Sequence, residues 1–214
     1  MERLFEDSQL LVINKPAGCI TEGPVKNGQA SLTDMLSHDL EKEVFACHRL
    51  DKDTTGVLVF AKTKLALRAL SEQFSKRQVR KTYLAAVEGV WSKSWNRVHT
   101  RIRRTAKGSL ENSSDGKEAI TTFRLLAQWN GRSLIEALPK TGRTHQIRLH
   151  CLYQGCLISG DGLYGDSSEG MPPMALHASE LRLLHPASGE PLRIGSALPD
   201  YWLKVWLKDC PVEI

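Results

Sequence analysis

The segment best suited to carry chemistry in this sequence is a polar loop, His48–Gly56, which reads HRLDKDTTG. The apolar run Val57–Ala61 follows it directly and is typical of a buried strand. A loop packed against a sheet can hold a carboxylate in one place beside an open pocket, as a catalytic aspartate requires. Asp51 is therefore a candidate catalytic residue. The alternative is that Asp51 only caps a charged turn.

A second candidate segment is Lys140–His150, which reads KTGRTHQIRLH and is dense in cations and hydrogen-bond donors. At the start of a helix, such a set can bind phosphates through side chains and backbone N–H groups together. A basic, solvent-exposed turn is the alternative. His145 and His150 are five residues apart, which is not the spacing of the metal-binding pair on a zinc-protease helix.

Two shorter segments complete the candidates. Arg80–Tyr83 stands at the start of a predicted strand, where Tyr83 is either a core residue or a residue of the site. Gly160–Gly165 reads GDGLYG and contains a second carboxylate, Asp161. We interpret Asp161 as the residue that orders its glycine-rich loop, with a competing catalytic role as the alternative.

Composition places the chain among globular proteins. It has 214 residues, of which 41% are hydrophobic and 25% charged, and this indicates one domain, residues 1–214, with a sizeable core. The net charge of +5 favours an anionic partner, although a solvated basic surface would give the same value. Five cysteines without paired spacing predict reduced thiols. The acidic N-terminus lacks the apolar core of a signal peptide, and no apolar stretch is long enough to span a membrane, so we expect a cytoplasmic protein.

Strand signals dominate the chain. The sequence predicts a hairpin turn at Asn130-Gly131 and a mobile loop over 103–117, where Lys, Gly, Ser, Asn and Asp cluster. The predicted strands are Leu10–Asn14, Tyr83–Val90, Ile120–Trp129, Ser133–Leu138 and Leu176–Leu184. Strands and helices do not alternate regularly, so the expected fold class is α+β: a mixed, mainly antiparallel β-sheet core flanked by helices.

Three helices and a helical tail are expected. Ser31 and Asp34 form a capping pair before the first helix. The second helix covers Thr63–Arg77, and the third covers His145–Gln154, with Thr144 as its cap and Gly155 as its stop. The tail Pro199–Leu207 is a further helix candidate. The predicted apolar face of the second helix is Leu65, Ala69, Leu70 and Phe74.

Taken together, these segments resemble the RluA-type pseudouridine synthases. In that family a His-Arg-Leu-Asp run precedes Thr-Ser-Gly and an apolar strand, as His48–Gly56 does here with Thr55 in place of the usual Ser. The other similar segments are Asn14–Gly18, Lys81–Ala85, Thr141–His150, Gly160–Gly165, Leu176–Ala178 and His185-Pro186. They occur in the family's order and cover most of the chain. Many relatives carry a small RNA-binding domain before the catalytic domain, and we expect this chain to contain the catalytic domain only.

The resemblance implies the fold of these enzymes and an isomerisation of uridine to pseudouridine in RNA. Asp51 would be the essential carboxylate, either attacking the sugar or removing a ribose proton; the sequence leaves both routes open. Arg148 would form a salt bridge to Asp51, so that Arg148→Ala should harm catalysis more than folding. Tyr83 would stack on the target uracil and assist proton transfer at carbon 5.

The resemblance also implies a substrate interface. Arg49 would occupy the space of the flipped nucleotide, with a phosphate contact as the equal alternative. The residues expected to bind substrate RNA are Arg49, His48, Thr55, Arg143, His145, Gln146 and Lys81. Two basic stretches are candidates for backbone contact: the residues Arg97, Arg101, Arg103, Arg104 and Lys107, and the residues Lys76, Arg77, Arg80 and Lys81.

No cofactor or metal is expected, because neither reaction step needs redox chemistry or an activated water. The expected partner is a stem-loop of ribosomal or transfer RNA, with no membrane, no obligate protein partner and a monomeric state. Two other functions are alternatives: a non-catalytic RNA-binding protein of the same fold, and a hydrolase that uses Asp51 or Asp161 with a histidine. The sequence contains neither a nucleophile elbow nor a complete triad, which argues against the hydrolase.

Overall fold

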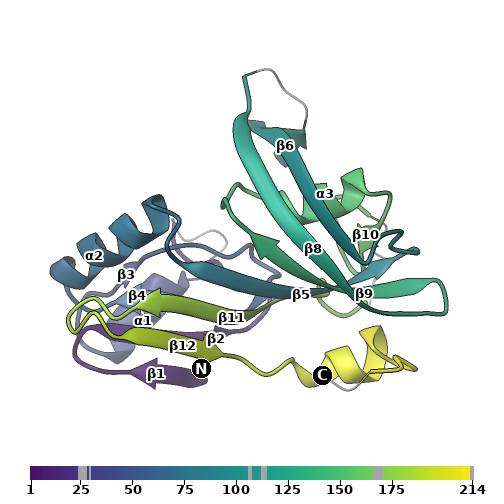
Figure 1. Ribbon diagram of the computed structural model, residues 1–214. Coiled ribbons are helices and arrows are strands. Elements are labelled where there is room, and N and C mark those ends of the chain that lie inside the picture. The colour runs from purple at the N-terminus through teal and green to yellow at the C-terminus, as the bar shows by residue number, and fades with distance from the viewer. Residues whose placement is uncertain (24–27, 29, 106–107, 112–114, 166–170, 213–214) are drawn as a thin grey trace. The chain divides into compact units, whose positions relative to one another are not determined.

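The computed structural model describes residues 1–23, 28, 30–105, 108–111, 115–165 and 171–212. The chain forms two compact units (Figure 1). Unit 1 contains Met1–Arg80 and Ala178–Ala197, and unit 2 contains Lys81–His177 and Leu198–Ile214. Both are built mainly from antiparallel strands with a few helices, so the expected α+β class is confirmed. No helix in the described part of the chain is long and apolar enough to cross a membrane.

Unit 1 is a set of strands with two helices. The strands run in the order β1-β2-β4-β11, with β12 paired to β11 and β3 paired to β4. The bounds are β1 Arg3–Glu6, β2 Leu10–Lys15, α1 Leu32–Asp39, β3 Phe45–Ala46, β4 Thr55–Ala61, α2 Lys64–Ser75, β11 Leu176–Leu184 and β12 Pro191–Gly195. The first two residues of β11 precede Ala178, where the second segment of unit 1 begins. Strand β4 is buried along its whole length, as its uninterrupted apolar sequence predicts.

The helices of unit 1 begin where local chemistry places them. Ser31 caps α1 and forms the predicted capping box with Asp34. Thr63 caps α2 by accepting a hydrogen bond from the Ala66 N–H. This start directs Ala66 and Leu70, with Leu67 and Phe74 beside them, onto β4 and β11. Leu65, predicted to lie on the buried face, is 80% exposed, because it lies about 100° around the helix from Ala66.

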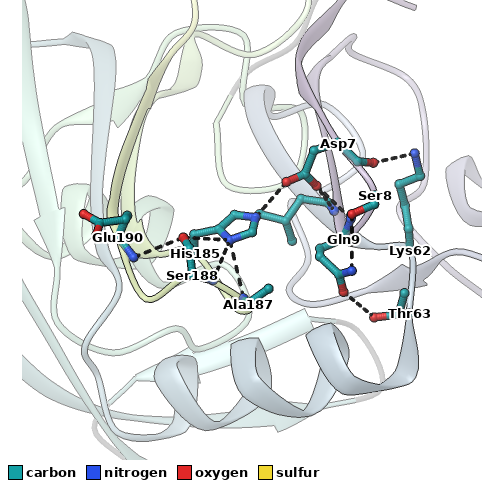
Figure 2. A network of polar contacts seen from close by, with 10 residues as sticks. Asp7, Ser8, Gln9, Lys62, Thr63, His185, Ala187, Ser188 and Glu190 are labelled. Atoms are coloured by element: carbon teal, nitrogen blue, oxygen red, sulfur yellow. Dashed lines mark hydrogen bonds and ion pairs between the residues drawn. The ribbon is translucent and has the colours of Figure 1, made fainter.

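A polar network joins two turns of unit 1 (Figure 2). His185 follows β11, and its Nε2 lies 2.8 Å from Asp7 Oδ2 in the turn between β1 and β2. His185 Nδ1 accepts the N–H of Ser188, so Nε2 carries the proton and donates it to Asp7. Lys62 donates to the Asp7 carbonyl at 2.7 Å. The network therefore fixes the β11–β12 turn against the β1–β2 turn.

Unit 2 contains antiparallel strands in the order β5-β9-β8-β6-β7, with β10 paired to β5. The bounds are β5 Arg80–Glu88, β6 Trp95–Thr105, β7 Gly108–Glu111, β8 Lys117–Trp129, β9 Arg132–Pro139, α3 Gln146–Tyr153, β10 Leu157–Ile158 and the π-helix η1 Trp202–Trp206; Arg80 itself belongs to unit 1. The predicted turn at Asn130-Gly131 is confirmed: both residues have positive φ, 44° and 74°, as a two-residue hairpin requires.

For unit 2, two expectations need correction and the expected helical tail is confirmed with a different helix type. The predicted loop over 103–117 is partly strand, because β6 continues to Thr105 and pairs with β7; residues 106–107 and 112–114 and the side chain of Arg104 lie outside the described part. The tail is helical, but residues 202–206 form a π-helix, which buries Trp202 and Trp206. Helix α3 is capped by His145 in a left-handed conformation, φ 54°, rather than by Thr144.

Candidate active site

The expected site residues divide between the two units. Unit 1 holds His48, Arg49, Asp51 and Thr55, and unit 2 holds Lys81, Tyr83, Arg143, His145, Gln146 and Arg148. We call the expected site residues of each unit, with their own contacts, a half-site. The pairing of Asp51 with Arg148 stays a prediction.

Asp51 lies in a short turn directly before β4, half-buried. The Thr54 N–H donates to the Asp51 carbonyl at 3.1 Å and closes the turn. On the other side, the Thr21 hydroxyl donates to the Leu50 carbonyl and accepts the Leu50 N–H, both at 3.3 Å. The backbone is thus fixed on both sides of the carboxylate, as a well-oriented catalytic group needs.

Beneath this loop lies Lys15, a fully buried lysine at the end of β2. Its ammonium donates to the carbonyls of Pro16, Lys52 and Thr54 at 2.9, 2.7 and 2.9 Å. All three ammonium protons therefore have acceptors. Burial lowers the pKa of Lys15 to about 8, although the negative charges around it, including that of Asp51, act in the opposite direction.

Lys15 is the residue of unit 1 that sequence reasoning missed. In the sequence, Asn14–Gly18 indicates only a family-like strand and turn. The one available signal was a lysine that directly continues an apolar strand. Burial of a charge there is unfavourable unless every ammonium proton has a hydrogen-bond acceptor.

The end of the loop depends on glycine. Gly56 has φ 107°, a conformation that other residues rarely adopt, and a Cβ there would collide with the backbone of Ala178 in β11. The close approach fixes where β4 begins, and so where the Asp51 turn ends.

The other expected residues of unit 1 differ in exposure. His48 is half-buried: its Nε2 accepts the Val59 N–H at 3.2 Å, and its ring stacks on Phe74 with centroids 4.8 Å apart. Thr55 is buried as the first residue of β4. Arg49 is exposed, with Nε 3.9 Å from Glu22 Oε1. Of these three residues, Arg49 is the one placed to meet a ligand in solvent.

In unit 2 the centre of the half-site is an ion pair that the sequence did not predict. Arg148, on α3, donates from Nε and Nη2 to the two oxygens of Asp161 at 2.7 and 2.6 Å. Both side chains are buried. Burial alone would raise the pKa of Asp161, but the hydrogen bonds and charge of Arg148, with the N–H groups of Leu163 and Tyr164, outweigh it and lower the pKa. Asp161 also orders its glycine-rich loop through these two N–H groups, in agreement with the first interpretation of this residue.

Tyr164 joins two other predicted residues. Its hydroxyl lies 2.9 Å from His145 Nδ1, and the Arg148 guanidinium lies over its ring, 5.0 Å from the centroid. In the sequence, Tyr164 stands out only as part of the GDGLYG loop. The contacts show that it fixes the His145 ring and one face of Arg148.

The remaining expected residues shape the loop before α3. The Gln146 amide accepts from the Thr141 hydroxyl and the Arg143 N–H, and it donates to Ile120 and Thr121. We therefore assign Gln146 to positioning this loop, because its amide is fully used inside the protein. Lys81 Nζ donates to the Thr141 carbonyl at 3.2 Å, and burial lowers the pKa of Lys81 to about 8.

Two further side chains of this half-site differ in their surroundings. Tyr83 is 9% exposed in β5, opposite Ala137 of β9. Arg143 is half-buried, and its Nε donates to the Glu118 carbonyl at 2.9 Å. Among the described residues no group of three or more His, Cys, Asp or Glu is placed to hold a metal ion.

Comparison with known proteins identifies the class to which this arrangement belongs. The profile of the RNA pseudouridylate synthase family matches residues 9–153. The chain belongs to this family, whose members are isomerases that act on RNA.

Individual relatives agree with the family match. The chain is 34% identical to ribosomal large subunit pseudouridine synthase C of Vibrio vulnificus, over 94% of this chain and 67% of the relative. It is 38% identical to synthase D of Xylella fastidiosa, over 94% and 66%. The chain thus spans about two thirds of the length of these relatives. The solved structure of human RNA pseudouridylate synthase domain containing 4 is similar, with a TM-score of 0.75 and 30% identity over 94% of this chain and 90% of that one.

Proposed function

We propose that this chain converts uridine to pseudouridine in structured RNA, with Asp51 as the essential carboxylate. The observation that carries the proposal is the rigid presentation of Asp51 within a chain of this family. The buried Lys15 ammonium, Thr21 and Gly56 fix the turn around a half-buried carboxylate. Residues 1–214 act as one catalytic domain in this proposal.

The reaction breaks the bond between ribose carbon 1′ and nitrogen 1 of the uracil, rotates the base and joins carbon 1′ to carbon 5. The proton on carbon 5 then leaves, and nitrogen 1, which no longer holds the sugar, takes up a proton, so that the product is an isomer of the uridine. Asp51 attacks the ribose or removes a ribose proton. In the proposed complex, Arg148 pairs with Asp51 and favours its ionised form. Tyr83 stacks on the uracil and assists the proton transfer at carbon 5.

The substrate class we propose is ribosomal or transfer RNA. The relatives include synthases named for the large ribosomal subunit, which favours ribosomal RNA. Arg49, Arg143, His145 and Lys81 are the proposed RNA-contacting residues near the site. The monomeric state and the cytoplasmic location expected from the sequence stay predictions.

The direct test uses RNA from cells that lack the gene. Purified protein is incubated separately with ribosomal and transfer RNA, and pseudouridine is mapped at nucleotide resolution. We expect new pseudouridines at a small number of uridines. Binding of RNA without any new pseudouridine would identify a non-catalytic RNA-binding protein and overturn the proposed activity.

The buried lysine offers a separate prediction. Lys15→Met leaves the Lys52 and Thr54 carbonyls without their donor, so the Asp51 turn loosens. Each unpaired buried polar group costs about 1–3 kcal/mol, partly offset because a buried charge is removed. We expect the melting temperature to fall by about 5 °C. We also expect kcat to fall by about 10- to 100-fold, because small displacements of a catalytic group have effects of that size.

Lys62→Met is the matched control. Lys62 lies in the same unit and also donates to a backbone carbonyl, that of Asp7, as well as to the Glu6 carboxylate, but it follows the last residue of β4, whereas the Asp51 turn precedes the first. Its replacement should lower stability and leave kcat near that of the wild type. Equal kcat values for Lys15→Met and Lys62→Met, at a temperature where both are folded, would show that Lys15 does not position Asp51.

A further inference from the structure

Two arginines face each other across the β11–β12 hairpin of unit 1. Arg182 pairs directly with Arg193 in the antiparallel register. Like charges in directly opposite positions destabilise a sheet. Glu180, two residues before Arg182 and therefore on the same face, compensates: its two oxygens accept Arg182 Nε and Arg193 Nε, each at 2.5 Å. We call these three residues the arginine fork.

The fork keeps most of its donors available. A guanidinium carries five N–H donors, and Glu180 occupies only the Nε donor of each arginine. No other hydrogen bond to either guanidinium is present in the described part of the chain. The arginine side chains are 49% and 70% exposed, whereas that of Glu180 is 15% exposed. Two oriented pairs of Nη groups therefore face solvent, and these are the donors that bind phosphate in a bidentate manner.

The surroundings of the fork favour an anion. An open groove is lined by both fork arginines together with Arg80, Gln78, Leu184 and Pro191. Burial alone would raise the pKa of Glu180, but its hydrogen bonds to the two arginines outweigh this effect and lower the pKa. The groove lining thus contains three arginines, and two of them share the ionised Glu180 carboxylate, so the groove and its support carry net positive charge. Its charge complements a polyanion.

The hairpin that carries the fork is held in place by contacts from α2 and from the β1–β2 turn. The Gln73 amide of α2 donates to the Leu184 carbonyl at 2.8 Å and accepts the Leu184 N–H at 2.9 Å. His185 and Asp7 fix the turn that follows (Figure 2). Donors that are oriented before binding lose less entropy when a ligand arrives.

The strand also relates the fork to the Asp51 turn. Strand β11 neighbours β4, and Ala178 of β11 lies against Gly56, where the Asp51 turn ends. Arg182 follows Ala178 by four residues, which corresponds to about 13 Å along a strand. A phosphate at the fork would therefore belong to nucleotides that flank the target uridine.

We propose that the arginine fork binds a phosphodiester group of the substrate RNA outside the target nucleotide. The proposal rests on the proposed function, because it takes RNA as the polyanion. It adds a specific contact on β11 and β12, elements in which no RNA-binding residue was predicted from the sequence.

The test compares RNA binding and turnover in the Arg182→Gln/Arg193→Gln double variant. The probe is ribosomal or transfer RNA from cells lacking the gene, whichever gains pseudouridine with wild-type protein. We expect the dissociation constant and KM to rise about tenfold, with a much smaller change in kcat. We also expect the slope of log K against log salt concentration to become shallower by about one, as for one lost phosphate contact.

Two control variants define the contact. Lys42→Gln/Lys64→Gln removes the same charge from exposed positions of unit 1 and should leave the salt slope unchanged. Arg182→Lys/Arg193→Lys keeps the charge but loses the bidentate geometry, so affinity should fall while the slope stays near that of the wild type.

The outcomes separate this proposal from the proposed function. If the folded Arg182→Gln/Arg193→Gln variant keeps the affinity and salt slope of the wild type, the proposal that the fork binds RNA is wrong. A fall in kcat at unchanged KM would also overturn it, by assigning the arginines a structural role. If wild-type protein binds RNA but forms no pseudouridine, the proposed activity fails. The affinities of the wild type and the glutamine double variant, measured on either RNA, still show whether the fork binds RNA.

Discussion

Asp51→Asn is expected to abolish pseudouridine formation, with a fall in kcat of at least about a thousandfold. An amide of the same shape can neither attack the ribose nor accept its proton, and loss of a catalytic carboxylate has effects of this order. The fold should persist. Lys15, Thr21 and backbone groups hold the turn, and asparagine has the same size and shape as aspartate. Single-turnover measurements on the RNA identified by mapping provide the rate.

Asp53→Asn is the control for this prediction. Asp53 lies two residues further along the same loop and is exposed, and both aspartates act on the charge of Lys15. The two variants therefore remove the same charge from the same loop. Asp53→Asn should retain most of the wild-type rate. If folded Asp51→Asn kept more than a tenth of that rate, Asp51 would not be the essential carboxylate.

The second large predicted effect is a loss of stability when the buried ion pair of Arg148 and Asp161 is broken. Because the pair is buried, Arg148→Met leaves the Asp161 carboxylate without its counter-ion, and breaking a buried pair in this way costs about 3–5 kcal/mol. The structure thus changes the expectation that loss of Arg148 harms catalysis more than folding. Denaturant unfolding of the single and double variants measures the free energy of unfolding. The Arg148→Met/Asp161→Asn double variant should recover much of the lost stability, because no buried charge remains unpaired.

Activity of the double variant then tests the pairing with Asp51. If Arg148 also supports Asp51, the double variant stays inactive despite its recovered stability. Near-normal turnover of the double variant would mean that Arg148 serves only to neutralise Asp161.

Acid pH provides an independent check of the same pair. Folding lowers the pKa of Asp161, so the pair's contribution to stability is present above the unfolded pKa of about 3.9 and is lost as pH falls through the lower folded value. In Asp161→Asn this part of the acid destabilisation should be absent. An identical loss of stability below about pH 4 in wild type and Asp161→Asn would contradict the assignment.

Local signals in the sequence were sufficient for many elements. The capping box at Ser31 and the turn at Asn130-Gly131 depend only on neighbouring residues, and both have the predicted form. The prediction of the buried face of α2 was wrong at Leu65, because packing on the sheet determines which of two adjacent apolar residues is covered. The prediction of Thr144 as the cap of α3 was wrong, because the hydrogen bonds of the Gln146 side chain to Arg143 and Ile120 determine where the chain turns.

The predicted site was incomplete for a related reason. The family-like segments located Asp51, Tyr83 and Arg148, but not the groups that hold them. Lys15 meets carbonyls 37 and 39 residues away, and Arg148 meets a carboxylate 13 residues away. Such partners are defined by the tertiary fold, and no local pattern of residue types reveals them.

The way the chain is divided has a consequence for its synthesis. Unit 1 combines the first 80 residues with residues 178–197. The strand that packs against Gly56 is therefore translated about 120 residues after the Asp51 turn it supports. A nascent chain on the ribosome cannot complete this half-site until unit 2 has almost entirely emerged. Premature termination before β11 should thus yield no partially active enzyme, and the emerging first 80 residues would depend on chaperones or on delayed folding to avoid aggregation.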